Sequence, residues 1–356
     1  KFTGFDLGTV WGNGDNQTTP YLLNISANQQ VYNKNDVSAL YTVILNANQL
    51  QNMNQNLSGK YLLGNDIDAS DTMNWNSGAG FNPVGNNSST FTGVFDGLNN
   101  TVGGLYISRP NQTQVGLFGV TYQATIQNIG LVSGSVLGGY QTAPLVGLLR
   151  NSLVNNSYAS TAVTGSKDTI GFVVGGLIGE TSASNIKNSY ATGSVKGATE
   201  NDWSFAGGLV GALMSNSSIE NSYTTGSVSG RGYVGGIVGW NLSSTIKNVY
   251  AIGAVSGINF IGGLAGNNDG TISNSFWNKE TTTLSNGVGG GNTSGVTGIT
   301  TAQMQNLSTF TDAGWDIDDV GGTGKVWRIY EGQTAPLLRS FLTTLDLNSI
   351  NKITTY

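Results

Sequence analysis

The sequence predicts an all-β protein built as a right-handed parallel β-helix, a single elongated domain in which each repeat forms one coil. The first observation is a phrase that recurs as NIKNSYATGSVKG, SIENSYTTGSVSG and TIKNVYAIGAVSG at residues 185–197, 218–230 and 245–257. The second is a series of short runs, such as Ser194-Val195-Lys196, in which apolar and polar residues alternate between turn-forming residues. A unit of this kind buries its apolar face only by stacking on neighbouring copies, which indicates a solenoid.

Residues 1–36 are assigned to the end of a preceding unit or to an N-terminal cap. Val10-Trp11 and Tyr21-Leu22 resemble Val326-Trp327 and Leu337-Leu338, and the matched positions are separated by the same distance along the chain in both cases. The two ends of the chain therefore share one sequence motif. We expect this in a segment of a tandem array, or in a subunit that stacks head to tail.

Residues 37–110 are expected to form irregular N-terminal coils of the same solenoid. The amide-rich stretch around Ala47–Asn54 predicts a short helix, and a strand is expected at Tyr61–Leu63. A helix at this position would cover the exposed edge of the stack, which a solenoid needs to avoid uncontrolled strand pairing.

Residues 111–280 form the regular coils, residues 281–342 the closing coils with a C-terminal cap, and residues 343–356 a tail or linker. Clear copies of a glycine-rich phrase begin at Gly175, Gly207, Gly235 and Gly262, so a coil takes roughly 30 residues. At this period the chain is expected to contain about ten or more coils. The glycines have two candidate uses, a positive φ at a corner or close approach between coils.

Equivalent residues of stacked coils should lie about 4.8 Å apart and form ladders along the axis. One predicted ladder is made of asparagines, each side-chain amide bonding to the next coil. A second is an aromatic stack. The ladder residues are Asn128, Asn156, Asn188, Asn221, Asn248 and Asn274, and Tyr158, Tyr190, Tyr223, Tyr250 and Phe276.

The composition excludes several classes of function. The chain has no His and no Cys, which removes Ser-His-Asp and Cys-His catalysis, the HExxH zinc site and a disulfide framework. Its 15 basic residues are scattered and the net charge is −5, so nucleic-acid binding is not expected. No apolar stretch approaches a membrane span, and we expect no membrane insertion and no cofactor. The chain is expected not to be an enzyme, and any enzyme here would have to work with carboxylates.

Three of the glycine-rich phrases, GGLIG, GGLVG and GGIVG at residues 175–179, 207–211 and 235–239, resemble the GLUG motif of bacterial surface proteins. The order of motifs over about residues 41–342 is similar to that of filamentous-haemagglutinin-type exoproteins of the two-partner secretion class. The resemblance implies export to the cell surface, a β-helical shaft and a role in adhesion. GLUG repeats also accompany IgA-specific metallopeptidases, but the zinc motif of those enzymes is absent from this sequence.

Clustered carboxylates are the candidate metal or catalytic residues. Asp66, Asp68 and Asp71 could bind calcium or act as the acid pair of a polysaccharide-cleaving β-helix enzyme, and WDIDD at 315–319 is a second cluster. The alternative is that these side chains cap turns through backbone hydrogen bonds. The calcium-loop spacing DxDxDG is missing, so no metal ligand and no catalytic residue is assigned.

Two further sets of residues are candidate surface sites. Asn-x-Ser/Thr sequons predict glycosylation on turns, with Asn87, Asn111, Asn216 and Asn241 as the candidates, although a chain this rich in Asn and Ser produces sequons by chance. Tryptophans could line a carbohydrate-binding face or fill a core. We expect exposure at Trp240 and Trp277 and a core or cap role at the matched Trp11 and Trp327; the set considered also includes Trp203 and Trp315.

The sequence is therefore interpreted as a rigid shaft of a secreted bacterial surface adhesin, presenting a binding surface to a host-cell or matrix receptor or glycan. One alternative is a self-assembling subunit whose matched ends join copies of the chain end to end into a filament. A second alternative is a carboxylate-based polysaccharide enzyme, for which replacement of Asp66 and Asp68 would abolish activity.

Overall fold

The structure is a computed structural model that describes residues 11–13, 17–23, 29–166, 172–197 and 204–342. The chain divides into two compact units, residues 1–301 and residues 302–356. The first unit is an all-β parallel β-solenoid, which confirms the predicted fold class. None of the helices in the described part of the chain has the length and apolar character that a membrane span requires.

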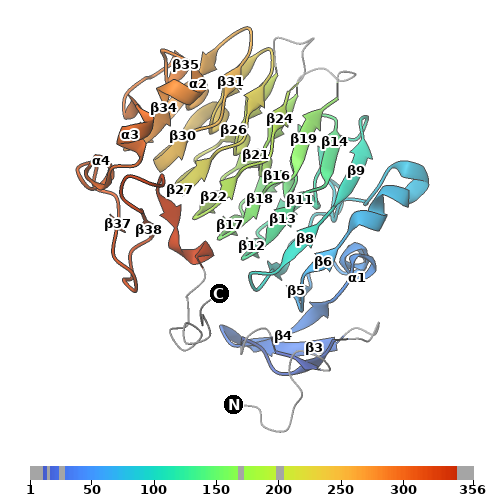
Figure 1. The fold of residues 1–356 in the computed structure, drawn as a ribbon. Helices are drawn as coiled ribbons and strands as arrows, with labels where there is room; N and C mark the ends of the chain where they lie inside the picture. Colours follow the sequence, from blue (N-terminus) through green and yellow to red (C-terminus); the bar gives the residue numbers. More distant parts are fainter. Residues whose placement is uncertain (1–10, 14–16, 24–28, 167–171, 198–203, 343–356) are drawn as a thin grey trace, which may run out of the picture. The chain divides into compact units, whose positions relative to one another are not determined.

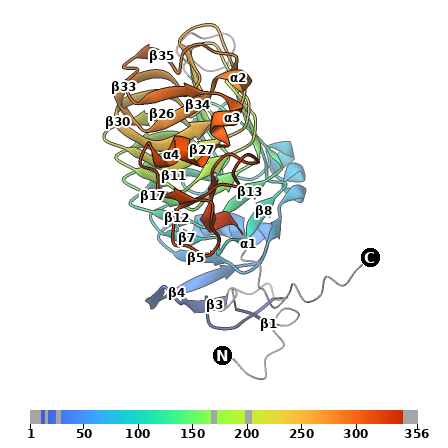
Figure 2. The same cartoon turned by 60° about the vertical axis from the view of Figure 1, so that its left-hand side comes forward.

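Parallel strands of successive coils lie side by side in rows along the first unit (Figures 1 and 2). Two of its sheets have six strands each. One is made of β10 Gln114–Val115, β15 Gln141–Thr142, β20 Val173–Gly175, β25 Phe205–Gly207, β29 Tyr233–Gly235 and β32 Ile261–Gly262. The other is made of β9 Tyr106–Arg109, β14 Ser135–Gly138, β19 Ala162–Gly165, β24 Val195–Lys196, β28 Val228–Ser229 and β31 Val255–Ser256.

The third and largest sheet covers the remaining faces of the coils. Its N-terminal strands are β3 Gln29–Asn33, β4 Asp36–Ile44, β5 Lys60–Leu63, β6 Ile67–Asp68, β7 Val94–Asp96 and β8 Thr101–Gly103. Its central strands are β11 Phe118–Tyr122, β12 Thr125–Gln127, β13 Gly130–Val132, β16 Val146–Arg150, β17 Leu153–Asn155, β18 Tyr158–Ala159, β21 Ile178–Ser182, β22 Asn185–Lys187 and β23 Tyr190–Ala191. It ends with β26 Val210–Met214, β27 Ser218–Thr224, β30 Val238–Ala251, β33 Ala265–Ser273, β34 Ser275–Asn278, β35 Val288–Gly291 and β36 Val296–Ile299.

Each of the two smaller sheets has six strands, one from each coil, so the described residues form about six coils. The expectation of ten or more coils was wrong. The repeat length was correct, but the chain on either side of the regular coils forms other structure. Before Val94 it builds a hairpin, short helices and incomplete coils, and after residue 301 it enters the second unit.

The core of the solenoid is a column of apolar side chains in register from coil to coil. In one row every member pairs with its neighbour across the sheet and is buried. The row consists of Ile126, Val154, Ile186, Ile219, Ile246 and Ile272. Because a strand exposes alternate residues on its two faces, one apolar position per strand is enough to fill this column.

The glycine-rich phrases serve close approach between coils rather than a left-handed corner. Neither of the first two glycines of the phrases has a positive φ. A Cβ added at Gly176 would lie 2.0 Å from the carbonyl oxygen of Gly208, and one at Gly208 would lie 2.0 Å from that of Gly236. The backbone of each coil occupies the space that any larger residue would need. The second candidate use is therefore the one the structure shows.

The N-terminal part of the first unit contains the predicted short helix. Helix α1 spans Ala47–Asn52 and continues as the 3-10 turn η1, Met53–Gln55. Its apolar residues Leu50 and Met53 are buried in the solenoid core, so the helix covers the first coils. Strands β3 and β4 pair as an antiparallel hairpin, and β4 joins β5 in parallel. The remaining short helices of this unit are η2 Ser70–Asn74, η3 Asn76–Gly78 and α2 Lys279–Thr282.

The second unit begins within α3 (Thr301–Met304) and continues through α4 (Leu307–Thr311) to a three-stranded sheet. Its strands are β37 Ile317–Asp318, β38 Trp327–Arg328 and β39 Leu337–Leu338, followed by η4 Arg339–Phe341. The ring centroids of Phe310 and Trp315 lie 5.0 Å apart, and those of Trp315 and Trp327 lie 4.9 Å apart. These rings form the core of the unit, and Trp327 is fully buried.

The matched phrases at the two ends form the same local structure. Strand β1 (Trp11–Gly12) pairs antiparallel with β2 (Tyr21–Leu22), and Trp11 faces Leu22. In the second unit β38 pairs antiparallel with β39, and Trp327 faces Leu338. The equivalent residues of the two phrases therefore occupy equivalent positions in two hairpins, and the sequence similarity reflects a duplicated structural element.

Candidate functional site

Helix α1 forms one wall of an open groove near the N-terminal end of the solenoid. The side chain of Asn46 caps the helix by accepting a hydrogen bond from the backbone N–H of Gln49 at 2.9 Å. Apolar residues three apart face the core, and the amide of Gln49 is buried beside them, where it accepts from the N–H of Leu45; four other amides face outward. The outward-facing amides belong to Asn48, Gln51, Asn52 and Gln55, and none of them is charged.

The opposite wall is the segment from η2 to η3, with Trp75 between the two turns. Asn76 and Ser77 have φ values of 53° and 57°, an uncommon conformation for residues with side chains. The Asn76 amide donates to the carbonyl of Gly80 at 2.8 Å, which holds the turn closed. The indole of Trp75 packs on Phe81 with ring centroids 6.4 Å apart, and its Nε1 donates to Asp71 at 3.3 Å.

Arg109, the last residue of β9, is the only charged side chain that lines the groove. Its Nε donates to the carbonyl of Phe81 at 3.0 Å and its Nη2 to that of Gly80 at 3.4 Å. Partial burial lowers the pKa of Arg109, although a guanidinium stays protonated. Within the described residues no carboxylate forms an ion pair with it.

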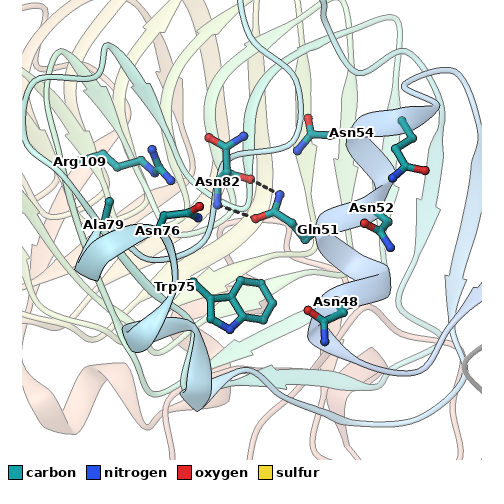
Figure 3. A pocket seen from close by; sticks show the side chains of 10 residues that line it. Asn48, Gln51, Asn52, Asn54, Trp75, Asn76, Ala79, Asn82 and Arg109 are labelled. Atoms are coloured by element: carbon teal, nitrogen blue, oxygen red, sulfur yellow. Dashed lines mark hydrogen bonds between the residues drawn. The ribbon is translucent and has the colours of Figure 1, made fainter.

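The groove has a volume of about 800 Å³ and is open to solvent (Figure 3). Hydrogen bonds of side-chain amides connect its walls. The amide of Gln51 donates to the carbonyl of Asn82 and accepts from the N–H of Asn82, both at 2.8 Å. Asn54 donates to Pro83 at 3.3 Å and accepts from Gly85 at 3.0 Å. These bonds make the site preformed.

The lining favours binding over catalysis. It contains one ionisable group, Arg109, and no pair of groups that could exchange a proton with a substrate. The amides of Asn48 and Asn52 are exposed and make no hydrogen bond among the described residues, so they are available to a ligand.

Sequence reasoning missed this groove. Trp75 and Arg109 were not singled out, and the amide-rich run at 46–56 was used only to predict a helix. That run was the signal that could have indicated a binding surface. A helix with one apolar face buries that face and presents its amides, which are neutral hydrogen-bonding groups, on the other side.

The predicted carboxylate cluster is not brought together as a metal site. Asp66 accepts from the N–H and the hydroxyl of Thr101 at 2.7 and 3.0 Å, and Asp68 accepts from the N–H of Ser70 at 2.9 Å. Asp71 bonds to Asn74 and to Trp75. Hydrogen bonds from the side chain and the backbone of Ser70 lower the pKa of Asp68. Within the described residues, no three carboxylates gather closely enough to hold a metal ion.

Two of the three carboxylates of the WDIDD stretch form ion pairs inside the second unit. Asp316 pairs with Lys325 at 2.8 Å, and Asp318 pairs with Arg339. The hydrogen bond from Lys325 lowers the pKa of Asp316. Both observations favour the interpretation in which these residues stabilise turns and strand ends.

The predicted asparagine ladder needs a correction. All six asparagines have a positive φ of 47–54°, and asparagine tolerates this left-handed conformation better than other residues with side chains. Asn156 does donate to Asn128 and Asn248 to Asn221, but Asn188 donates to Asn155. The Oδ1 atoms of Asn188 and Asn248 are buried and accept no hydrogen bond, so the amide ladder is interrupted. The corner conformation, rather than a continuous ladder, accounts for the repeated residue.

The aromatic residues stack along the coils. The ring centroids of Tyr158, Tyr190, Tyr223 and Tyr250 are separated in turn by 4.7, 4.8 and 4.9 Å, with interplanar angles of 6–9°. Phe276 pairs in register with Tyr250 on the next strand. Burial raises the pKa of Tyr190, Tyr223 and Tyr250, because the phenolate would be desolvated.

The glycosylation candidates divide into two groups. Asn87, Asn111 and Asn216 are exposed. Asn241 is fully buried in β30, and its amide donates to Asn268 at 2.7 Å. A sugar cannot be attached to this nitrogen in the folded protein, so the structure argues against glycosylation at Asn241.

The tryptophan predictions were partly wrong. Trp277 is buried, because its ring lies on Gly263, Gly287 and Gly298, where a Cβ would collide with it. Trp240 is half-buried, and its Nε1 donates to Asp269 at 2.8 Å. Trp11 is half-buried, whereas Trp327 and Trp315 are core residues of the second unit. Trp203 lies outside the described residues.

Comparisons with known proteins identify a known sequence motif in the repeat region. A family model described as the GLUG motif matches residues 171–196, 206–229 and 230–256. Over 113 residues, 31% of this chain, the sequence is 41% identical to halomucin of Haloquadratum walsbyi (strain DSM 16790 / HBSQ001). That segment is 1% of halomucin, so this chain spans a very small part of the relative it matches.

The fold is similar to that of a crystal structure from Bacteroides ovatus that carries a provisional assignment as an immunoglobulin A1 protease. The TM-score is 0.61 at 21% identity, over 85% of this chain and 93% of that chain. A second solved structure, named IgA1 Protease, has a TM-score of 0.43 at 18% identity and covers 66% of this chain and 21% of its own. The first likeness is one of fold alone.

Proposed function

We propose that this chain is a structural and adhesive module of a secreted cell-surface protein, a rigid shaft that presents a binding surface to host cells, matrix or other cells. The observation that carries the proposal is the continuous core of the solenoid, in which apolar residues from Ile44 to Val288 belong to one buried cluster. Such a stack resists deformation because each coil is bonded to its neighbours along its whole length. Three GLUG motifs and the halomucin-like segment support an extracellular role.

Export by two-partner secretion, as in filamentous-haemagglutinin-type exoproteins, belongs to the same proposal, on the strength of the sequence resemblance. No cysteine or histidine is needed for such a role, and a groove lined mainly by amides, with Arg109 as its one ionisable group, is suited to binding rather than to catalysis.

The proposal is tested by coating beads with the purified chain and counting the beads that remain on epithelial monolayers and on matrix-coated surfaces after washing. We expect retention above that of beads coated with the same chain after heat denaturation. Equal retention of the two kinds of bead on every surface would exclude an adhesive role for this module.

The filament alternative is supported by the duplicated hairpins, β1–β2 and β38–β39. It predicts that the sedimentation coefficient increases steadily with protein concentration. A constant coefficient over a wide range of concentration is expected for the adhesive module.

The polysaccharide-enzyme alternative has less support, because Asp66 and Asp68 are bonded to separate neighbours. Release of reducing ends from polygalacturonate by the native chain, but not after Asp66→Asn and Asp68→Asn, would reinstate it.

A further inference from the structure

The guanidinium of Arg109 is directed from one wall of the groove towards Asn82, and the helix α1 amides lie beyond it (Figure 3). An arginine has five N–H donors. Two of them are used by the carbonyl groups of Phe81 and Gly80. The lining of the groove contains no carboxylate, and within the described part of the chain the positive charge of Arg109 has no counter-ion.

The other groups of the groove are those that recognise sugars. Trp75 supplies an aromatic surface beside the helix amides, and Asn48 and Asn52 supply exposed amides. An amide can donate to one hydroxyl and accept from another, which matches the hydroxyl pattern of a pyranose ring. An aromatic ring packs against the apolar face of such a ring.

We propose that this groove binds a saccharide that carries a carboxylate, with Arg109 pairing to the carboxylate and Trp75 packing against the sugar ring. Planar guanidinium groups bind carboxylates in a two-point geometry, and such charge-assisted hydrogen bonds are stronger than neutral ones. The inference rests on the proposed adhesive function, for which it names the ligand class. The carboxylate can belong to a sialic acid or to a uronic acid, and the experiment distinguishes these sources.

The site requires little rearrangement to bind. Gln51 of helix α1 and Asn54 of η1 already bond to the segment that follows η3, and Asn76 holds its turn closed through the carbonyl of Gly80. Preorganised walls reduce the entropy that a ligand would otherwise lose on ordering the site.

The test is titration calorimetry of the full chain with sialyllactose, a galacturonic-acid trisaccharide and, as the neutral probe, lactose. At least one acidic saccharide is expected to bind about tenfold or more tightly than lactose, with binding that weakens as salt is added. Whichever acidic probe binds identifies the source of the carboxylate. Equal affinity for acidic and neutral probes, or binding of none of the three, would overturn the proposal.

Two variants with matched controls locate the site. Arg109→Gln should lower the affinity for the acidic saccharide by about tenfold or more and so remove its preference over lactose. Lys196→Gln removes an exposed positive charge elsewhere on the solenoid and should have no effect. Because Arg109 also holds the carbonyl of Phe81, Asn52→Asp provides a second test that keeps the fold.

Asn52 is exposed, so a carboxylate at this position should repel an acidic ligand without disturbing packing. Its control is Thr192→Asp, which adds the same charge at an exposed position on a distant coil. Acidic-saccharide binding that withstands both Arg109→Gln and Asn52→Asp would place the ligand elsewhere and refute the assignment.

The outcome is separable from the adhesion assay. Calorimetric binding without bead retention would leave the ligand class standing and reject the adhesive function. Bead retention that is insensitive to both groove variants and to added acidic saccharide would support adhesion and reject this groove as the site.

Discussion

Replacing one glycine in the middle of the solenoid should separate two coils. We consider Gly208→Ala, in the phrase between β25 and β26. A Cβ at this position would lie 2.0 Å from the carbonyl oxygen of Gly236, whereas non-bonded carbon atoms have their optimum separation at about 3.5–4.0 Å. The atom in the way belongs to the backbone, so no change of rotamer relieves the collision.

The magnitude follows from the bonds that cross this contact. The N–H of Gly208 donates to Gly235 at 3.1 Å, and that of Leu209 donates to Ile237 at 2.9 Å. A shift of about 1 Å takes both beyond hydrogen-bonding distance. Two lost backbone hydrogen bonds contribute about 2 kcal/mol, and overpacking adds about 1–3 kcal/mol. We expect the free energy of unfolding to fall by about 3–5 kcal/mol.

The assay is equilibrium unfolding in urea, followed by far-UV circular dichroism and tryptophan fluorescence. The matched control is Gly103→Ala in β8, where an added Cβ meets nothing closer than a methyl group of Val132 at 3.5 Å. This control should be neutral or stabilising by up to about 1 kcal/mol, because alanine has less conformational freedom than glycine in the unfolded chain.

The result that refutes the reasoning is a Gly208→Ala protein that unfolds at the same urea concentration and with the same slope as Gly103→Ala. In that case the coils can separate at little cost, and the glycine-rich phrase does not reflect close approach of the backbones.

Three further predictions concern single side chains. Burial raises the pKa of Glu180, which accepts a hydrogen bond from Gln141 at 2.9 Å. The contribution of Glu180 to the free energy of unfolding is therefore complete below its unfolded-state pKa and is lost as pH rises through its folded-state pKa. Glu180→Gln should raise the Tm at pH 7 but not at pH 4 in scanning calorimetry, and equal shifts at both pH values would contradict this. Asn188→Ala should cost about 1–2 kcal/mol in urea unfolding because of the left-handed φ, whereas Asn188→Gly should cost much less; equal losses would restore the amide ladder as the reason for the asparagine. On expression in a host that glycosylates sequons, peptide mass spectrometry should find sugar at Asn216 and none at Asn241, and a modified Asn241 would show that modification precedes folding of β30.

The candidate site illustrates why sequence reasoning reached the scaffold but not the groove. The row from Ile126 to Ile272 could be read from the repeat, because each member has the same neighbours in every coil. The groove lies where the pattern is irregular. Trp75, Gln51 and Arg109 come from three separate segments, and their proximity depends on how the irregular coils fold back on one another.

Charged and polar candidates failed for a related reason. Asp66, Asp68 and Asp71 are close in the sequence, but each is bonded to a different donor. Asn241 has a valid sequon, but it lies on the inner face of its strand. A local pattern gives residue type and spacing, whereas burial and partners depend on which face the backbone turns inward.

The sequence by itself determined the parallel β-solenoid, the length of a coil, the capping helix near its start and the stacking of Tyr158 to Tyr250. The coils and the tyrosine stack repeat, and a repeat places equivalent residues at equivalent positions without knowledge of the rest of the fold. The helix does not repeat, but it forms within one short stretch, Ala47–Asn52. Only the tertiary structure decided that the glycines serve close approach, that Trp277 is buried and that Arg109 lines a groove whose described residues include no carboxylate. The physical reason is that each of these depends on contacts between residues from different segments, and those contacts exist only when the chain has folded.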